Sequence, residues 1–494
     1  MENCIKKSAP LKKLQNPSKI FPHPEHLSLE ELVGQLFIFR WDAGNESATE
    51  ELLQKFKPGG FILFGGERKT TSTWIQHFQQ ESSFPLFIAS DMERGVGQQI
   101  RGGIEFPSQM TVSSTENPQY AFQMGYHTAL QAKSLGVNLL FAPVADVNNN
   151  PENPIIKERS YGSDPHRVAQ YCQSYIRGAT QGKALSCAKH FPGHGDTTQD
   201  SHHTLPVIQK TLERLKLMEL IPFQACIQAQ VPMIMTAHIL YPTLSDQVAT
   251  LSSEILTQLL RKELGFQGLI VSDALTMKGL ADYCSESEAI LRAIRAGIDL
   301  ILIPKNPEEA VLSLMRAVRE KQISRNLLEV AVQRIFHFKQ EFQIHETPPY
   351  LLEEEGQKIS EEIAQKSILH EGTPWKSTKD DQFLCFLPSN QPELAGPFLK
   401  SMEGRATTYS SQLFKVSPAL IPVIFSETRA YGTPVSSEKM WGDMARCIEA
   451  SKRCIWFGYP STKTSLPPSE SMLRTFGTAK VSQLAIAKLL QKGG

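Results

Sequence analysis

The stretch Leu269–Met277, LIVSDALTM, decides how the fold of this chain is interpreted. Its first part, Leu269–Ser272, has the length of a strand and no polar alternation, which is typical of a strand buried on both faces. Asp273 follows this run directly, so a carboxylate stands at the end of a buried element. An aspartate in this position is either a structural cap or a nucleophile or general base.

Similar apolar runs of strand length recur along the first two thirds of the chain. They are Gln35–Phe39, Gly60–Phe64, Leu86–Ser90, Val137–Phe141, Leu185–Lys189, Met233–Thr236 and Leu300–Ile303. Helix-like stretches lie between most of them: Asn117–Leu135, Asp164–Gly182, Thr211–Gln230, Ser253–Leu264 and Ser285–Ala296. Eight strands alternating with helices predict an α/β fold, a TIM-type (β/α)8 barrel over residues 1–345. A doubly wound open sheet would show the same alternation, so the periodicity by itself leaves both architectures open.

Polar or reactive side chains come just after many of the predicted strands. They are Asp91, Asp146, His190, His238 and Asp273. In a TIM barrel the active site lies at the carboxyl ends of the strands. The clustering therefore predicts a site on that face.

The last part of the chain has a different pattern. Helical sequence continues through Asn306–Gln343, and a turn with two prolines and a helix over Gly356–His370 predict a linker and connecting helix over residues 346–378. From about Lys379 short strands follow (FLCFL, ALIPVIF and CIWFGY), with a last helix near Lys480–Gln491. Residues 379–494 are therefore predicted to form a second, smaller α/β domain, and none of them is predicted to take part in the chemistry.

The composition excludes several classes of protein. Hydrophobic residues make up 41% and charged residues 21% of the 494 residues, an ordinary globular balance. Lys plus Arg and Asp plus Glu are both 51, so no net charge favours a nucleic-acid partner. No run approaches the roughly 20 apolar residues that cross a bilayer, so no membrane partner is expected.

The cysteines and the N-terminal stretch indicate a cytoplasmic location. The eight cysteines are scattered and contain no CxxC pair, which is typical of reduced, buried thiols. MENCIKKSAPLKKLQNPSKIF has basic residues but no apolar core, so neither a signal peptide nor a lipoprotein anchor at Cys4 is expected.

The densest group of reactive residues is the stretch Lys189–Pro206, KHFPGHGDTTQDSHHTLP. It begins at a strand end and holds too many turn residues for a helix, so a long polar loop is expected, and such loops in barrels are usually functional. A solvated loop with incidental histidines is the plainest interpretation. His190, His194 and Asp196 are a plausible zinc ligand set, although Pro192 and Gly193 prevent the helical register that makes such spacing useful.

General acid–base chemistry is the third interpretation of this loop. Asp200 and His202 are two residues apart, so in an extended segment both side chains face the same way. A carboxylate that holds one imidazole nitrogen raises the pKa of the ring and leaves the other nitrogen to deliver a proton.

These motifs together resemble glycoside hydrolase family 3, in particular its NagZ-type β-N-acetylglucosaminidase branch. KHFPGHGDTTQDSHHTLP is followed by VSDALTM, and the same order includes APVADVNNNPENPIIKERSYGSDP (Ala142–Pro165), IMTAHILYP (Ile234–Pro242) and ATLS (Ala249–Ser252). The resemblance runs from about Leu29 to Phe342. Several motifs in the right order make it specific.

The resemblance implies a retaining, two-step hydrolysis without a metal or other cofactor. Asp273, in the SDAL motif, would attack the anomeric carbon. His202, in the DSH motif, would act as acid/base with Asp200 as its partner. The common glycosidase mechanism uses two carboxyl groups, and a histidine avoids a second negative charge beside Asp273.

The resemblance also assigns contacts to the terminal sugar. Lys189 and His190 match the KH pair of the family, Arg159 matches the arginine of the RSYG motif, and Asp91 matches an aspartate that holds sugar hydroxyls. The stretch after Asp91 departs from the usual D-x-E-G-G-R-V-x-R. It reads DMERGVGQQIR, with Val96 and Gln99 where arginines are usual, and Arg94 or Arg101 is the candidate replacement.

The expected function is that of an exo-acting β-N-acetylglucosaminidase. Its partner would be a small carbohydrate, a GlcNAc-containing muropeptide of cell-wall recycling. A phosphorylase on the same fold is the chemical rival, because a neutral or cationic His202 tolerates an incoming phosphate. Two further rivals are a non-catalytic amino-sugar-binding protein and a metal-dependent hydrolase.

Overall fold

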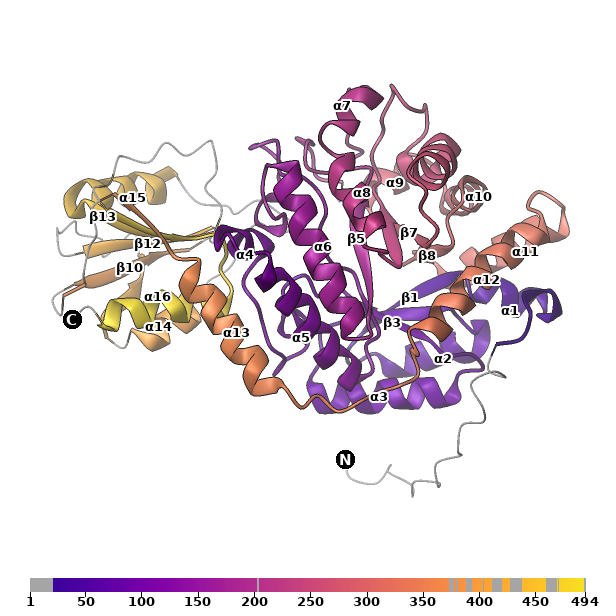
Figure 1. Ribbon diagram of the computed structural model, residues 1–494, viewed down its shortest axis with the longest axis horizontal. Helices are drawn as coiled ribbons and strands as arrows, with labels where there is room; N and C mark the ends of the chain where they lie inside the picture. The colour runs from indigo at the N-terminus through magenta and orange to yellow at the C-terminus, as the bar shows by residue number, and fades with distance from the viewer. Residues whose placement is uncertain are drawn as a thin grey trace, which may run out of the picture.

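The structure is a computed structural model that describes residues 21–201, 204–372, 377–378, 381–387, 393–402, 404–410, 420–426, 438–458, 469 and 471–492. A barrel surrounded by helices is followed by a smaller sheet with helices on both faces (Figure 1). A long helix, α13 (Glu353–Lys366), lies between the two.

Eight parallel strands close into a barrel in the order β1 to β8. They are β1 (Phe37–Asp42), β2 (Gly60–Phe64), β3 (Phe87–Ser90), β4 (Leu139–Leu140), β5 (Leu185–Phe191), β6 (Met233–Thr236), β7 (Leu269–Ala274) and β8 (Leu300–Leu302). The barrel closes because β8 pairs with β1 through Ile301 opposite Phe37 and Leu302 opposite Ile38. The predicted TIM-type barrel is confirmed, and each predicted strand overlaps an observed one.

Helices cover the outside of the barrel. They are α1 (Leu29–Gly34), α2 (Glu46–Phe56), α3 (Arg68–Glu81), α4 (Gln109–Ser114), α5 (Gln119–Leu135), α6 (Pro165–Gln181), α7 (Leu212–Lys216), α8 (Leu220–Gln228), α9 (Lys278–Ala281), α10 (Glu286–Ala296), α11 (Pro307–Arg319) and α12 (Arg325–Glu341). The single helix predicted over Thr211–Gln230 is two helices, α7 and α8. The helix predicted over Ser253–Leu264 is a π-helix, Glu254–Glu263.

Local capping explains where several helices begin and end. The Ser285 hydroxyl accepts a hydrogen bond from the Glu288 backbone N–H and starts α10, and Gly297 ends it with φ of 109°. Asp164 caps α6 in the same way, with Pro165 in the first turn, where its missing N–H costs nothing. These signals are local, which is why the sequence located both helices.

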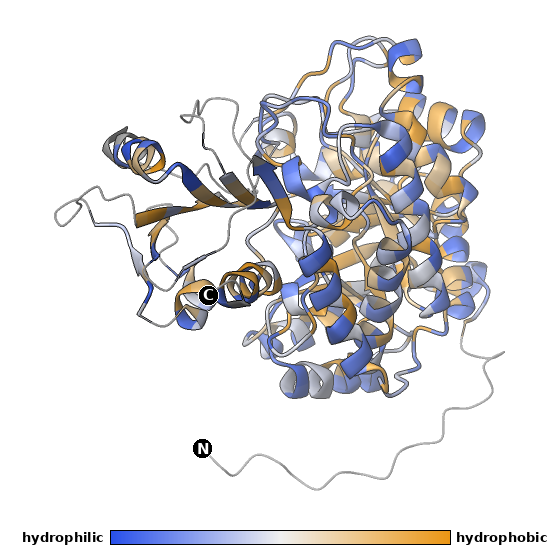
Figure 2. Ribbon diagram, turned by 60° about the vertical axis from the view of Figure 1, so that its left-hand side comes forward, coloured by the Kyte–Doolittle hydropathy of each residue, from blue (hydrophilic) through white to orange (hydrophobic). Residues whose placement is uncertain are grey.

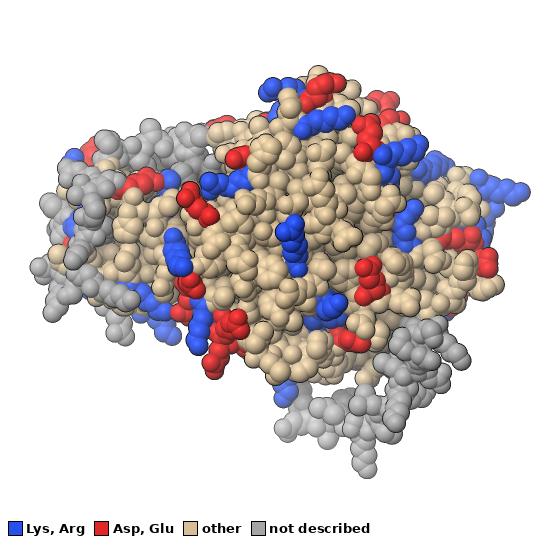
Figure 3. Space-filling model, viewed as in Figure 1, with Lys and Arg blue, Asp and Glu red and all other residues tan. Residues whose placement is uncertain are grey.

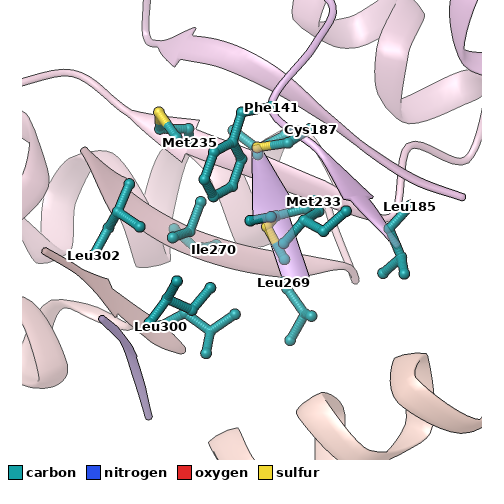
Figure 4. Close-up of a cluster of buried hydrophobic side chains, with 14 of the residues drawn as sticks. Phe141, Leu185, Cys187, Met233, Met235, Leu269, Ile270, Leu300 and Leu302 are labelled. Atoms are coloured by element: carbon teal, nitrogen blue, oxygen red, sulfur yellow. The ribbon is translucent and has the colours of Figure 1, made fainter. Parts of the chain in front are cut away.

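The barrel interior is a packed apolar core. Figure 4 shows Phe141, Leu185, Cys187, Met233 and Leu300 among the side chains that meet there. All five are buried. In Figure 2 the hydrophobic colour is concentrated at the centre of the barrel and the hydrophilic colour on the outer parts of the surrounding helices. The carboxyl end of this core is the floor on which the candidate site is built.

In the part of the second domain that the structure describes, the sheet has six strands in the order β11-β10-β12-β13-β14-β9. They are β9 (Leu369–Gly372), β10 (Gln382–Phe386), β11 (Ala406–Thr408), β12 (Leu420–Ser426), β13 (Arg453–Gly458) and β14 (Ser471–Thr475), and only β9 is antiparallel to its neighbour. The helices are α14 (Gly396–Ser401), α15 (Glu438–Ser451) and α16 (Lys480–Lys492). The expected second α/β domain is confirmed.

Alternation along β10 explains the layers of this domain. Phe383 and Cys385 pack with α14 and α16, whereas Leu384 and Phe386 pack with α15 on the other face. The sequence missed β9, β11 and β14. Each is short and partly polar, and β9 lies in the stretch predicted as linker and connecting helix.

Charged side chains of both signs are interspersed on the face drawn in Figure 3. Among the described residues, no helix is both long and apolar enough to span a bilayer.

Candidate active site

A cavity of about 530 Å³ opens at the carboxyl end of the barrel strands. Its apolar floor includes Ile62, Phe141, Met235 and Leu302, which close the top of the barrel core. Charged and amide side chains form its walls. The sequence predicted a site at this end, and the cavity is lined by Asp91, Arg159, Lys189, His190 and Asp273.

Strand β5 brings two consecutive residues to the cavity. Leu185 and Cys187 face the barrel interior, and Lys189 follows on the same face because side chains alternate along a strand. The pairing of β5 with β6 shifts register between Lys189 and Phe191, and such irregularities re-aim side chains. The next residue, His190, therefore lines the cavity as well.

Lys189 is buried and held by two carboxylates. Its Nζ lies 2.7 Å from Asp91 Oδ1 and 2.8 Å from Glu93 Oε1. Burial by itself would lower the pKa of Lys189, but the charges of Asp91 and Glu93 outweigh it and raise the pKa above its ordinary value. The ammonium group is therefore charged at neutral pH.

Glu93 joins Lys189 to Arg159. The Arg159 guanidinium donates from Nε at 3.0 Å and from Nη2 at 2.7 Å to the two oxygens of Glu93. Burial would raise the pKa of Glu93, but the charges of Arg159 and Lys189 lower it well below its ordinary value. The three predicted contacts Asp91, Lys189 and Arg159 thus form one network, whose centre is a residue that the sequence did not assign to the site.

Asp146 holds the part of the β5 loop that contains His190 and His194. Its carboxylate is buried and lies 2.7 Å from His190 Nδ1. It also accepts hydrogen bonds from the backbone N–H of His194 at 2.6 Å and of His190 at 3.2 Å. Burial would raise the pKa of Asp146, but His190 and His194 lower it. Asp146 uses the Nδ1 atom of His190, so the Nε2 atom is available for a hydrogen bond with another group.

The loop after β5 passes close to the loop after β4. A Cβ atom built on Gly195 would lie 1.6 Å from the carbonyl oxygen of Val147. Only glycine allows the two backbones this approach. Gly195 therefore allows the loop after β5 to pack closely against the loop after β4, and this packing positions the residues of the loop.

Asp273 stands at the end of β7 and lines the cavity. The β7–β8 pairing shifts register between Val271 and Ala274, so the strand is irregular where Asp273 lies. One carboxylate oxygen of Asp273 accepts a hydrogen bond from the Ala274 backbone N–H at 2.8 Å. This contact restrains the side chain over the floor of the cavity.

The remaining predicted residues belong to the loop after His194. Asp200 is half-buried, and its neighbour Ser201 lines the cavity. His202 lies outside the residues that the structure describes. His190, His194 and Asp196 are the residues whose spacing suggests a zinc site. Within the described residues, no group of three or more His, Cys, Asp or Glu side chains is arranged to hold a metal ion.

The stretch after Asp91 contains the two arginines suggested as replacements. Arg94 lines the cavity together with Gln98 and Gln99. Arg101 instead pairs with Glu67 at 3.0 Å, and 83% of its side chain is exposed. Of the two arginines, only Arg94 lies at the cavity.

The second domain also reaches the cavity, which the sequence did not predict. Gly477 and Thr478 follow β14 and line the cavity. The Ser108 hydroxyl, at the start of α4, donates a hydrogen bond to the Phe476 carbonyl and holds this turn against the barrel. No local signal marks these residues, because their contact depends on how two distant segments meet.

A closed parallel barrel with a polar, charge-lined cavity at the carboxyl ends of its strands has the architecture in which barrel enzymes bind their substrates. The sequence model of the glycosyl hydrolase family 3 N-terminal domain matches residues 28–338. The chain therefore belongs to glycosyl hydrolase family 3.

Known proteins similar to this chain include hexosaminidases. This chain is 35% identical to a beta-hexosaminidase A of Pseudoalteromonas piscicida over 324 aligned residues, and the match covers 58% of this chain and 54% of the relative. The chain thus spans about half the length of that relative.

The solved structures that resemble nearly the whole chain include two enzymes with TM-scores above 0.8. One is a glycoside hydrolase family 3 beta-N-acetylglucosaminidase from Paenibacillus sp. str. FPU-7, with 27% identity, a TM-score of 0.82 and coverage of 94% of this chain and 97% of that one. The other is a beta-glucoside phosphorylase, with 23% identity, a TM-score of 0.86 and coverage of 95% and 93%. At that identity the second likeness concerns the fold alone.

Proposed function

We propose that this chain is a retaining exo-β-N-acetylglucosaminidase that removes terminal β-linked GlcNAc. One observation carries the proposal: Asp273 borders the same cavity as the network of Asp91, Lys189 and Arg159. A nucleophile and a set of sugar-hydroxyl partners are the two parts that a glycosidase needs. The hexosaminidase names of the relatives support GlcNAc as the sugar.

In the first step, Asp273 attacks the anomeric carbon and forms a glycosyl ester. The bond from that carbon to the aglycone oxygen breaks, and His202 gives its proton to this oxygen, with Asp200 as its partner. In the second step, His202 takes a proton from water, the water oxygen attacks the same carbon, and Asp273 leaves as a carboxylate. Two displacements at one carbon retain the β configuration.

Asp91, Lys189, Arg159 and His190 would hold the terminal sugar. Asp91 is partly exposed, with 31% of its side chain accessible, and would accept hydrogen bonds from sugar hydroxyl groups. Lys189 donates to hydroxyl oxygens from its charged ammonium group. The Asp146–His190 contact fixes the Nδ1 side of the ring, so that Nε2 is free to meet the sugar.

GlcNAc-containing muropeptides of cytoplasmic cell-wall recycling are the proposed substrates. The cysteines that the structure describes are all free thiols, which agrees with a reducing compartment.

The test is turnover of an aryl β-N-acetylglucosaminide beside the matching aryl β-glucoside, with the product analysed by NMR. We expect the N-acetylglucosaminide to be preferred and free β-GlcNAc to appear first. Equal or faster turnover of the glucoside would refute the assignment of the sugar.

The same assay repeated with phosphate and with a chelator separates the rival chemistries. Sugar 1-phosphate as the product would identify a phosphorylase, and loss of activity with the chelator would identify a metal-dependent enzyme. Binding of GlcNAc without turnover of any of these substrates would leave an amino-sugar-binding protein.

A further inference from the structure

His194 is a buried histidine to which the proposed chemistry gives no role. It lies in the β5 loop, its ring is 1% exposed, and its backbone N–H is held by Asp146. Both ring nitrogens have partners in the same loop: Nδ1 lies 3.1 Å from Thr197 Oγ1, and Nε2 lies 2.8 Å from Ser201 Oγ.

Hydrogen bonds within the loop hold both the ring and the carbonyl group of His194. The Thr197 hydroxyl lies 3.2 Å from the His194 carbonyl oxygen, to which it donates, and its oxygen lies 3.1 Å from Nδ1. Asn153 Nδ2 donates to the same carbonyl at 2.8 Å and to Thr197 Oγ1 at 3.2 Å. The ring is thus held at Nδ1 by Thr197 and at Nε2 by Ser201, and either tautomer makes both hydrogen bonds.

Ser201 is held from a second side as well. Its carbonyl oxygen accepts a hydrogen bond from the Gly279 backbone N–H at 3.2 Å, in the segment that follows β7. A Cβ atom built on Gly279 would lie 3.0 Å from this oxygen, so the contact is close. Ser201 is 1% exposed and joins the β5 loop to the segment that follows Asp273.

Ser201 is the residue between Asp200 and His202 in the chain. We infer that His194 is a positioning residue for the proposed acid/base pair: through its hydrogen bond with Ser201, it holds the backbone directly after Asp200. This inference rests on the proposed function. It predicts that loss of the His194–Ser201 bond weakens proton transfer to the aglycone and leaves sugar binding and the Asp273 attack largely intact.

Aryl β-N-acetylglucosaminides with different leaving groups provide the test. A 2,4-dinitrophenolate leaves without a proton, whereas a phenolate needs one from the general acid. For Ser201→Ala we expect kcat/KM to fall by up to about 100-fold with the phenyl substrate, the loss that a small misplacement of a reacting group produces, and to change little with the dinitrophenyl substrate. His194→Leu should give the same pattern, and the basic limb of the pH–rate profile should shift in both variants.

Matched controls separate positioning from folding. His127 is also a buried histidine, with Nδ1 3.0 Å from the Tyr350 hydroxyl and no place on the cavity wall, so His127→Leu is the control for His194→Leu. Ser313→Ala removes a buried hydroxyl on α11 and is the control for Ser201→Ala. Neither control should change the dependence on the leaving group.

An equal loss with both leaving groups, or no loss with either, would overturn the inference. If His194→Leu fails to fold, Ser201→Ala still decides the question, because it removes one hydroxyl only. The proposed function fails separately: it fails if Asp273→Ala turns over both substrates as the unaltered chain does.

Discussion

Glu93 accepts two hydrogen bonds from Arg159, at 2.7 and 3.0 Å, beneath the cavity of the barrel. The same carboxylate lies 2.8 Å from Lys189 Nζ. Glu93 and Asp91 together thus compensate the two buried positive charges of Lys189 and Arg159, and Asp91 is the more exposed of the two carboxylates.

Glu93→Gln would leave two buried cations with one fewer partner charge. We expect the free energy of unfolding to fall by about 3–5 kcal/mol, the usual cost of breaking a buried ion pair. Thermal and urea unfolding of the variant would measure this loss. Glu67→Gln, which removes an exposed partner of Arg101, should change the stability by less than about 1 kcal/mol. An equal effect of both substitutions would contradict the role given to Glu93.

Asp273→Ala tests the nucleophile. Turnover of an aryl β-N-acetylglucosaminide should fall by about 1000-fold or more, because the variant lacks the carboxylate that forms the glycosyl ester. The thermal midpoint should stay near that of the unaltered chain. Asp282→Ala, an exposed aspartate at the end of α9, is the control and should retain full activity. Unchanged turnover by Asp273→Ala would show that another group forms the ester.

The free energy of unfolding should depend on pH in part through the protonation of His194. Burial, with the charge of the neighbouring His190, lowers the pKa of His194 to about 4, while Asp146 and Asp273 act in the opposite direction. The folded state therefore binds fewer protons than the unfolded state between about pH 4 and 6.5. The contribution of His194 to the free energy of unfolding is fully present above about pH 6.5. It falls as the pH is lowered, by up to about 1.4 kcal/mol per pH unit.

The low pKa values of Glu93 and Asp146 also remove stability in acid, so a difference measurement is needed. Urea unfolding of the unaltered chain and of His194→Leu at several pH values supplies it. The difference in the free energy of unfolding between the unaltered chain and His194→Leu should become smaller as the pH falls from 6.5 to 4. A constant difference would show that His194 has an ordinary pKa.

Thr478→Phe tests the part of the cavity that the second domain provides. A larger side chain on the wall should raise KM for a GlcNAc-containing disaccharide by about tenfold and leave the kcat of a small aryl substrate nearly unchanged. Leu489→Phe, on an exposed position of α16, is the matched control. If KM is the same in both variants, the wall formed by Gly477 and Thr478 does not meet the substrate.

The sequence located the barrel well because its signals are local. A strand such as Met233–Thr236 is recognised from consecutive apolar residues, and the observed β6 has these bounds. The helix over Thr211–Gln230 was wrong as a single element, because the chain turns at Leu217–Glu219. Pro222 follows in the first turn of α8, where a proline is tolerated, whereas inside one long helix it would remove a backbone hydrogen bond. The sequence did not predict the strands β9, β11 and β14, because their apolar content is low. They are extended because they pair with neighbouring strands.

By itself, the sequence determined the alternation of strands and helices, the second α/β domain and the strand-end positions of Asp91, Lys189, His190 and Asp273. Each depends on neighbours within a few positions, where hydrophobic periodicity and motif spacing act. The closure of the strands into a barrel depends on the pairing of β8 with β1. Tertiary structure alone decided that Glu93 joins Lys189 to Arg159, that His194 meets Ser201, and that Thr478 of the second domain borders the cavity. These contacts join segments that are distant in the chain, or residues that one loop folds together. Their energy depends on burial and geometry, which no local sequence pattern contains.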